Sequence, residues 1–162
     1  MDADFDPIDE ARRQWIAHGW EDAADGMTFV TSIMRAQQLM LARVDRTLRP
    51  FNLTFARYEL LALLSFTRTG QLPMSKATAR LQVHPTSMTN AVDRLEHAGL
   101  VARSPHPRDG RTTLVGITDA GRALVGEATE ALNSVFRSPG LEQPQLDVML
   151  DLLAQHRRNL AD

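Results

Sequence analysis

The chain has 162 residues, 43% of them hydrophobic and 23% charged, and a formal net charge of −2. This length predicts one domain, or one domain with appended elements, and the composition is ordinary for a globular protein. It contains no cysteine, which excludes disulfide bonds, thiol redox sensing and cysteine-ligated zinc. No apolar run is long enough to span a membrane and the acidic start lacks the apolar core of a secretion signal, so we expect a cytoplasmic protein.

The charge is unevenly distributed along the chain. Residues 1–26 hold eight acidic residues and two arginines, whereas residues 71–118 hold six basic and three acidic residues. A locally basic middle in a mildly acidic chain suits contact with a polyanion. Random drift of charge over a segment of this length is the open alternative.

Apolar spacing predicts helices in the first part of the chain. The first, over residues 8–20, contains both tryptophans, and the second, over residues 27–48, has an apolar residue at nearly every third or fourth position. Pro50 ends the second helix. Thr54 can cap a third helix, and the short segment 70–75 that follows this helix can add one strand.

The middle of the chain predicts a helix-turn-helix. Ser75 can cap a short helix, and after a tight turn Pro85 occupies the favoured first position of a second helix over residues 85–98. Gly99 can end that helix in the left-handed conformation. The two helices are therefore short and joined by a turn of three or four residues.

The second of these helices has an unusual polar face. Its apolar face comprises Met88, Ala91, Val92 and Leu95. The opposite face carries threonine and asparagine, which cost helix propensity, where a merely solvated face favours glutamate and lysine. Short hydrogen-bonding side chains of this kind can approach base edges from a recognition helix. A tolerant exposed surface is the alternative. The polar face consists of Thr86, Ser87, Asn90, Asp93, Arg94 and His97.

A basic β-hairpin follows directly. Residues 100–103 and 113–117 predict two strands, and an Asp-Gly pair at Asp109 predicts the turn that joins them. Arg108 and Arg111 flank that turn, and arginine suits a narrow minor groove. The Asp109 carboxylate can accept hydrogen bonds from the turn and hold Arg111 in place. The hairpin is therefore expected to stand beside the second helix as a wing.

The run from Leu53 to Arg122 resembles the MarR family of bacterial winged helix-turn-helix regulators. The segment RLEHAGLVARSPHPRDGRTTLVGITDAGR carries the resemblance through its Gly-Leu-Val helix exit, Asp-x-Arg wing tip and Ile-Thr-Asp-Ala-Gly close. The resemblance implies a mainly α fold with a small β-hairpin wing. Residues 51–118 would form the winged helix-turn-helix domain, and residues 1–50 and 119–162 the helical dimerisation region.

The same resemblance implies a function. The protein would be a homodimeric transcriptional regulator, expected to be a repressor, that reads a pseudo-palindromic site in double-stranded DNA without a metal or other cofactor. The helix face and the family pattern together assign DNA contact to Ser75, Lys76, Thr86, Ser87, Thr89, Asn90, Arg94, Arg108, Asp109 and Arg111.

Apolar stripes outside the winged domain support a dimer. Residues 119–137 predict a helix that Pro139-Gly140 breaks, and a last helix follows. One small winged domain cannot bury this last stripe together with the tryptophans and the apolar residues of 27–48, so we expect the two ends to join across a two-fold axis. The stripe of the last helix consists of Leu146, Met149, Leu150 and Leu153.

The resemblance also implies an effector site between the dimerisation helices and the winged domain. An aromatic acid, a fatty acid or an acyl-CoA ester would fit soft and aromatic side chains, with Arg35, Arg43 or His18 at its anionic end. The same residues also suit an ordinary core, so effector-independent DNA binding stays open. The candidate lining is Trp15, His18, Trp20, Phe29, Ile33, Arg35, Met40, Arg43, Tyr58 and Phe66.

Two other function classes are weaker. The five histidines are scattered, and the sequence has no zinc-protease, P-loop, nucleophile-elbow or dinucleotide-binding motif, so we do not expect an enzyme. A winged helix that binds only other proteins is the stronger rival, but the arginines of the wing and the Thr/Asn face favour DNA.

Overall fold

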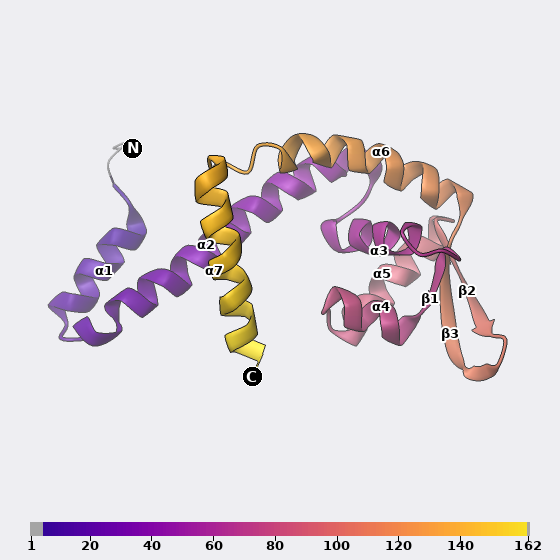
Figure 1. Cartoon of the computed structure of the whole chain (residues 1–162), viewed down its shortest axis with the longest axis horizontal. Helices are drawn as coiled ribbons and strands as arrows, with labels where there is room; N and C mark the ends of the chain where they lie inside the picture. The colour runs from indigo at the N-terminus through magenta and orange to yellow at the C-terminus, as the bar shows by residue number, and fades with distance from the viewer. Residues whose placement is uncertain (1–4, 162) are drawn as a thin grey trace.

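The computed structural model describes residues 5–161 and is mainly helical, with a small antiparallel sheet. Figure 1 shows a winged domain at one end, joined by long helices to an extended region at the other. This confirms the predicted fold class. The elements are α1 (Pro7–Ala17), α2 (Glu21–Leu48), the 3-10 helix η1 (Arg49–Phe51), α3 (Phe55–Ser65), β1 (Gln71–Pro73), α4 (Met74–Leu81), α5 (Pro85–His97), β2 (Val101–His106), β3 (Asp109–Ile117), α6 (Asp119–Phe136) and α7 (Gln143–Ala161).

The break between the two N-terminal helices lies earlier in the chain than the apolar spacing predicts. Helix α1 ends at Ala17, and Trp20 is the N-cap residue of α2 instead of the last turn of α1. Gly19, with φ of +82°, makes the reversal. Helix α2 begins six residues before its predicted start because residues 21–26 are acidic or small, which suits a first helical turn but leaves no apolar pattern to detect.

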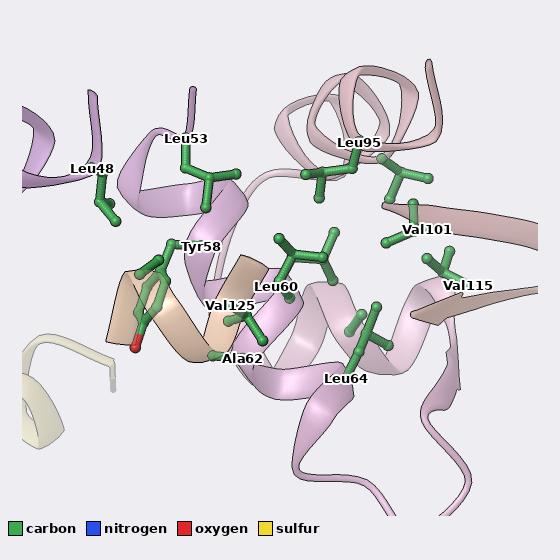
Figure 2. Packing of buried hydrophobic residues seen from close by; sticks show 14 of the residues in the cluster. Leu48, Leu53, Tyr58, Leu60, Ala62, Leu64, Leu95, Val101, Val115 and Val125 are labelled. Atoms are coloured by element: carbon green, nitrogen blue, oxygen red, sulfur yellow. The ribbon is translucent and has the colours of Figure 1, made fainter. Parts of the chain in front are cut away.

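The core of the winged domain is built on α3. Leu60 and Leu64 of α3 are fully buried and face Leu95 of α5, Val101 of β2 and Val115 of β3, as Figure 2 shows. Helix α6 packs over α3 on the other side of the domain from the wing tip (Figure 1). The apolar face predicted for the second helix of the helix-turn-helix is confirmed, because its methionine, valine and leucine are all buried.

The sheet has the order β1–β3–β2, with both pairs antiparallel. The segment 70–75 does supply a strand, β1, in which Leu72 pairs with Val115. The hairpin of β2 and β3 is longer than predicted. Strand β2 continues past residue 103, where the first predicted strand ends, and β3 begins before residue 113, where the second predicted strand starts.

The predicted position of the wing turn is wrong. Pro107 and Arg108 form the turn, while Asp109 already pairs with His106 and Gly110 lies inside β3 with a φ outside the left-handed region. A register shift next to Pro105 absorbs the extra residues of β3. Proline suits the first central position of a turn because its φ is preset, and this local preference outweighs the Asp-Gly signal two residues later.

The base of the wing is tightly joined to α6. The Thr118 hydroxyl caps α6 by accepting from the Gly121 amide at 3.0 Å, and it donates to the Gly99 carbonyl at 2.8 Å. The Thr118 amide donates to the Leu100 carbonyl at 3.1 Å. A side chain at Gly121 would meet that carbonyl oxygen at 2.2 Å, so the close approach of helix and strand requires glycine here.

The helices outside the winged domain leave much apolar surface uncovered. Helix α7 crosses α2 (Figure 1), and no α7 residue is buried. In the predicted stripe of this helix Met149 and Leu150 are exposed, whereas Leu146 and Leu153 are half-buried. Helix α2 adds exposed Phe29, Val30, Met34, Leu39, Met40 and Leu41. Patches of this extent are typical of protein interfaces.

Candidate nucleic-acid interface

The polar face of α5 is exposed at its N-terminal end, where a recognition helix contacts bases. Thr86, Ser87, Thr89 and Asn90 are all exposed. His84 is the N-cap residue, and its Nδ1 accepts from the Thr86 amide at 3.2 Å. The first turn of α5 is therefore held by a side chain of the turn before it, and its hydroxyl and amide groups face outward.

Helix α4 supports α5 and also presents polar residues. Ser75 and Lys76 are exposed in its first turn. The sequence predicts Ser75 as the N-cap of this helix, and this is wrong. The helix follows β1 directly, and Pro73 occupies the N-cap position without a side-chain hydrogen bond. Gln82 ends α4 with φ of +52°.

Two shallow grooves flank this helix pair. The first, of about 590 Å³, runs between the start of α3 and α5 and is lined by Thr54, Ala56, Arg57, Ser87, Asn90, Ala91 and Arg94. The second, of about 390 Å³, runs between the β1–α4 segment and the wing and is lined by Thr69, Gln71, Pro73, Lys76, His106, Pro107, Arg108 and Leu114. Each groove contains two long basic side chains. Five of the predicted DNA-contacting residues, Lys76, Ser87, Asn90, Arg94 and Arg108, thus lie in one groove or the other.

Arg57 belongs to this surface but was missed by the sequence argument. It lies on α3, outside the helix-turn-helix, and its Nε donates to the Thr54 hydroxyl at 3.2 Å. The same groove contains Arg94 of α5. No periodicity in α3 distinguishes Arg57 from any exposed arginine, because its place depends on how α3 packs beside α5.

The wing tip is organised by Asp109, as predicted. Its carboxylate accepts from the Arg111 amide at 3.1 Å and from the Thr112 hydroxyl at 2.7 Å. These hydrogen bonds, the Thr112 hydroxyl first, lower the pKa of Asp109 below its usual value. Next to them, Nδ1 of His106 accepts from the Arg108 amide at 3.2 Å. The backbone of the tip is therefore held in place, and the side chains of Arg108 and Arg111 are exposed.

A second residue missed by the sequence argument joins the wing to α5. The Arg103 guanidinium of β2 pairs with both Asp93 and Glu96 of α5. The Arg103 amide also donates to Glu96 Oε1 at 2.9 Å. The pKa of Glu96 is lowered mainly because its carboxylate accepts the hydrogen bond from that amide, and the hydrogen bond from the guanidinium lowers it further. Asp93, predicted as part of the free polar face, is therefore engaged by the wing.

The candidate effector residues are spread out within the single chain. Tyr58 is buried in the core, where its hydroxyl lies 3.0 Å from that of Thr129, whereas Phe66 is 82% exposed at the end of α3. Along α2, Phe29 and Arg43 are separated by about 21 Å at 1.5 Å per residue. Neither of the two grooves described above is lined by any of these residues.

Parts of the set do make local contacts. Trp15 and Trp20 lie edge to face with ring centres 5.3 Å apart, and His18 stacks on Trp20 at 5.7 Å. Phe29 meets His156 of α7 at 4.9 Å. Arg43 donates to the Ser138 carbonyl at 2.8 Å. Of the others, Ile33 is half-buried, and Arg35 and Met40 are exposed.

Between residues 5 and 161, no cluster of three or more histidine, aspartate or glutamate side chains could hold a metal ion. Within that range, no helix combines the length and the apolar character needed to cross a membrane.

Comparison with known proteins connects this surface to a family. The model of the MarR family matches residues 53–113. An uncharacterized HTH-type transcriptional regulator of Mycobacterium bovis is 34% identical over 99 residues. That match covers 57% of this chain and 66% of the relative, so the chain spans just under two thirds of the length of this relative.

Solved structures match over more of the chain. A MarR family transcriptional regulator from Streptomyces coelicolor is 47% identical with a TM-score of 0.77, over 85% of this chain and 96% of that chain. BpsR of Bordetella bronchiseptica is 26% identical with a TM-score of 0.72, over 78% of this chain and 91% of that chain. The BpsR structure concerns regulation of its DNA binding by 6-hydroxynicotinic acid.

Proposed function

Because the chain belongs to the MarR family of transcriptional regulators, we propose that it binds double-stranded DNA sequence-specifically, as a homodimer that represses transcription. The observation that carries the proposal is the exposed polar face of α5, with one groove beside α5 and a second groove between the β1–α4 segment and the wing, each of which contains two long basic side chains. A helix in the major groove lies between two phosphate backbones. The grooves would accommodate those backbones while α5 reads the bases.

The residues divide into two roles under this proposal. Thr86, Ser87, Thr89 and Asn90 would approach base edges, because they are short, exposed and near the start of α5. Ser75, Arg57, Arg94, Lys76 and Arg108 would contact phosphates, which position the protein without reading sequence. Arg111, held at the wing tip through its backbone, would reach the minor groove, and Asp109 would support it.

The dimer is proposed from the uncovered apolar surface of α2 and α7. Covering it with the same surface of a second copy would place two α5 helices on one face of DNA, with half-sites about one helical turn apart. Under this proposal the protein would act on chromosomal DNA in the cytoplasm and would need no catalytic activity.

An aromatic acid or its thioester is proposed as the effector. The aromatic cluster of Trp15, His18 and Trp20 on the dimerisation helices supports this, as does the ligand of the BpsR relative. Since the candidate residues are separated within one chain, a second subunit would have to complete the pocket. A ligand releases DNA only as far as it binds the DNA-incompetent dimer more tightly. A regulator without an effector is the second candidate.

Selection of bound DNA from a random pool, followed by binding titrations at several salt concentrations, tests the central proposal. A pseudo-palindromic consensus and a steep fall of affinity with salt are expected, because each phosphate contact adds about 0.9 to the salt slope. Absence of DNA binding even at low salt would favour the protein-binding alternative.

A thermal-shift screen of aromatic acids, fatty acids and their coenzyme A esters, repeated with operator DNA, tests the effector. Failure of every compound to change both stability and DNA affinity would favour effector-independent regulation.

A further inference from the structure

Helix α5 carries two carboxylates close to the surface that is proposed to meet DNA. Asp93 lies one helical turn after Asn90, and Glu96 lies one turn after Asp93. The Asp93 side chain is 57% exposed. A free carboxylate at this place would repel phosphates, and it could compete with a base for the amide of Asn90.

The wing supplies the partner of both carboxylates. One nitrogen of the Arg103 guanidinium pairs with Asp93 and the other with Glu96. Arginine suits this place because its planar fork can bind two acceptors in fixed directions, which a lysine ammonium cannot do. The Arg103 side chain is only 26% exposed, less than either carboxylate, so the network lies against the protein between β2 and α5.

The backbone of the wing takes part in the same network. Strand β2 lies at the edge of the sheet, and the amide of Arg103 donates to Glu96 and not to a neighbouring strand. Glu96 therefore receives one hydrogen bond from the edge of the wing and one from the guanidinium. Together these contacts fix the first strand of the wing against the C-terminal half of α5.

We propose that Arg103 is a positioning residue for DNA binding, which holds the wing at a set angle to α5 and turns Asp93 away from the DNA. This inference rests on the proposed function and adds a residue to it that does not itself touch DNA. Two consequences follow. The effect of Asp93 on DNA affinity depends on Arg103, and so does the benefit from Arg111 at the wing tip.

The first test is a double-mutant cycle with Arg103→Ala and Asp93→Asn in the full-length chain, measured by operator binding. Arg103→Ala is expected to weaken binding about tenfold. Asp93→Asn should restore most of that loss in the Arg103→Ala background and change the affinity of the otherwise unaltered protein less than about twofold. Arg46→Ala, at an exposed arginine in the last turn of α2, is the control for loss of one positive charge.

The cycle separates positioning from net charge. If Arg103 acts only by adding a positive charge near DNA, Asp93→Asn tightens binding by the same factor in both backgrounds, because charge effects of this kind add. Equal factors would overturn the proposal, and so would equal affinities of Arg103→Ala and Arg46→Ala.

A second cycle tests the wing angle. Arg111→Ala should cost less in the Arg103→Ala background than in the unaltered protein, since a wing that is no longer fixed uses its tip less well. Equal costs would contradict the proposal. If Arg103→Ala does not fold, Arg103→Lys replaces it in both cycles, because lysine keeps the charge without bridging both carboxylates. Failure of the unaltered protein to bind any DNA would refute the proposed function, whereas normal DNA binding with additive cycles would refute only the role of Arg103.

Discussion

Replacing Gly121 by alanine should destabilise the protein, although alanine is the better helix former. An alanine Cβ would lie 2.2 Å from the Leu100 carbonyl oxygen and 2.8 Å from a side-chain carbon of Ile117. The carbonyl cannot rotate away freely because it accepts from the Thr118 amide at 3.1 Å. Relief to ordinary contact at 3.4 Å therefore requires the start of α6 to move away from the base of the wing.

The magnitude follows from two opposing terms. Overpacking of this kind costs about 1–3 kcal/mol, and replacing glycine inside a helix gains about 0.5–1 kcal/mol. A net loss of about 1 kcal/mol, and at most about 2.5 kcal/mol, in the free energy of unfolding is expected. Gly126 is the matched control, because it lies on the same helix, is exposed and has open space at its Cβ. Gly126→Ala should gain about 0.5–1 kcal/mol.

Urea unfolding followed by circular dichroism, at one fixed protomer concentration for all three proteins, measures both effects. The expected order of stability is Gly126→Ala, then the unaltered chain, then Gly121→Ala. If Gly121→Ala is as stable as Gly126→Ala, α6 does not pack closely enough against the base of the wing to exclude a side chain at position 121.

The remaining predictions concern the DNA surface and the dimer. Arg111→Ala should weaken DNA binding without changing stability and reduce the salt slope by about 0.9; an unchanged slope would remove the wing from the interface. Asn90→Ala should relax preference at one base position in each half-site, whereas an equal loss for all sequences would indicate a backbone contact. Deleting residues 142–162 should produce monomers or aggregates in light scattering, and a DNA-binding dimer after that deletion would contradict the dimer assignment. The pKa of Asp109 is lowered in the folded protein, so the stabilising contribution of its carboxylate is present above the ordinary aspartate pKa and is lost as the pH falls through the lowered value. Thr112→Val should raise the pKa of Asp109 in an NMR titration. An unchanged pKa would show that the Thr112 hydroxyl is not the main cause of the lowering.

Local sequence determined the parts of the fold whose causes lie within one or two helical turns. The burial of Met88, Val92 and Leu95, with polar residues opposite, follows from spacing along a single helix. Gly99 ends α5 with φ of +72°, as its residue type predicts. The hairpin and the hydrogen bonds of Asp109 also arise from near neighbours in the chain.

Tertiary structure decided what depends on contact between distant segments. Arg57 lines a groove with Arg94 because α3 packs beside α5, and Arg103 engages Asp93 because β2 lies along the same helix. Such pairings leave no periodic trace in the sequence, since each partner alone is an ordinary charged residue.

The apolar stripe of α7 lies between these two cases. Its spacing is plain in the sequence, but a single chain leaves Met149 and Leu150 exposed. An amphipathic pattern specifies which face of a helix must leave water and not which surface covers it, since the hydrophobic effect has no direction of its own. The sequence thus determined that this face needs a partner, and only the arrangement of the helices in space showed that α2 and the other residues between 5 and 161 do not supply it.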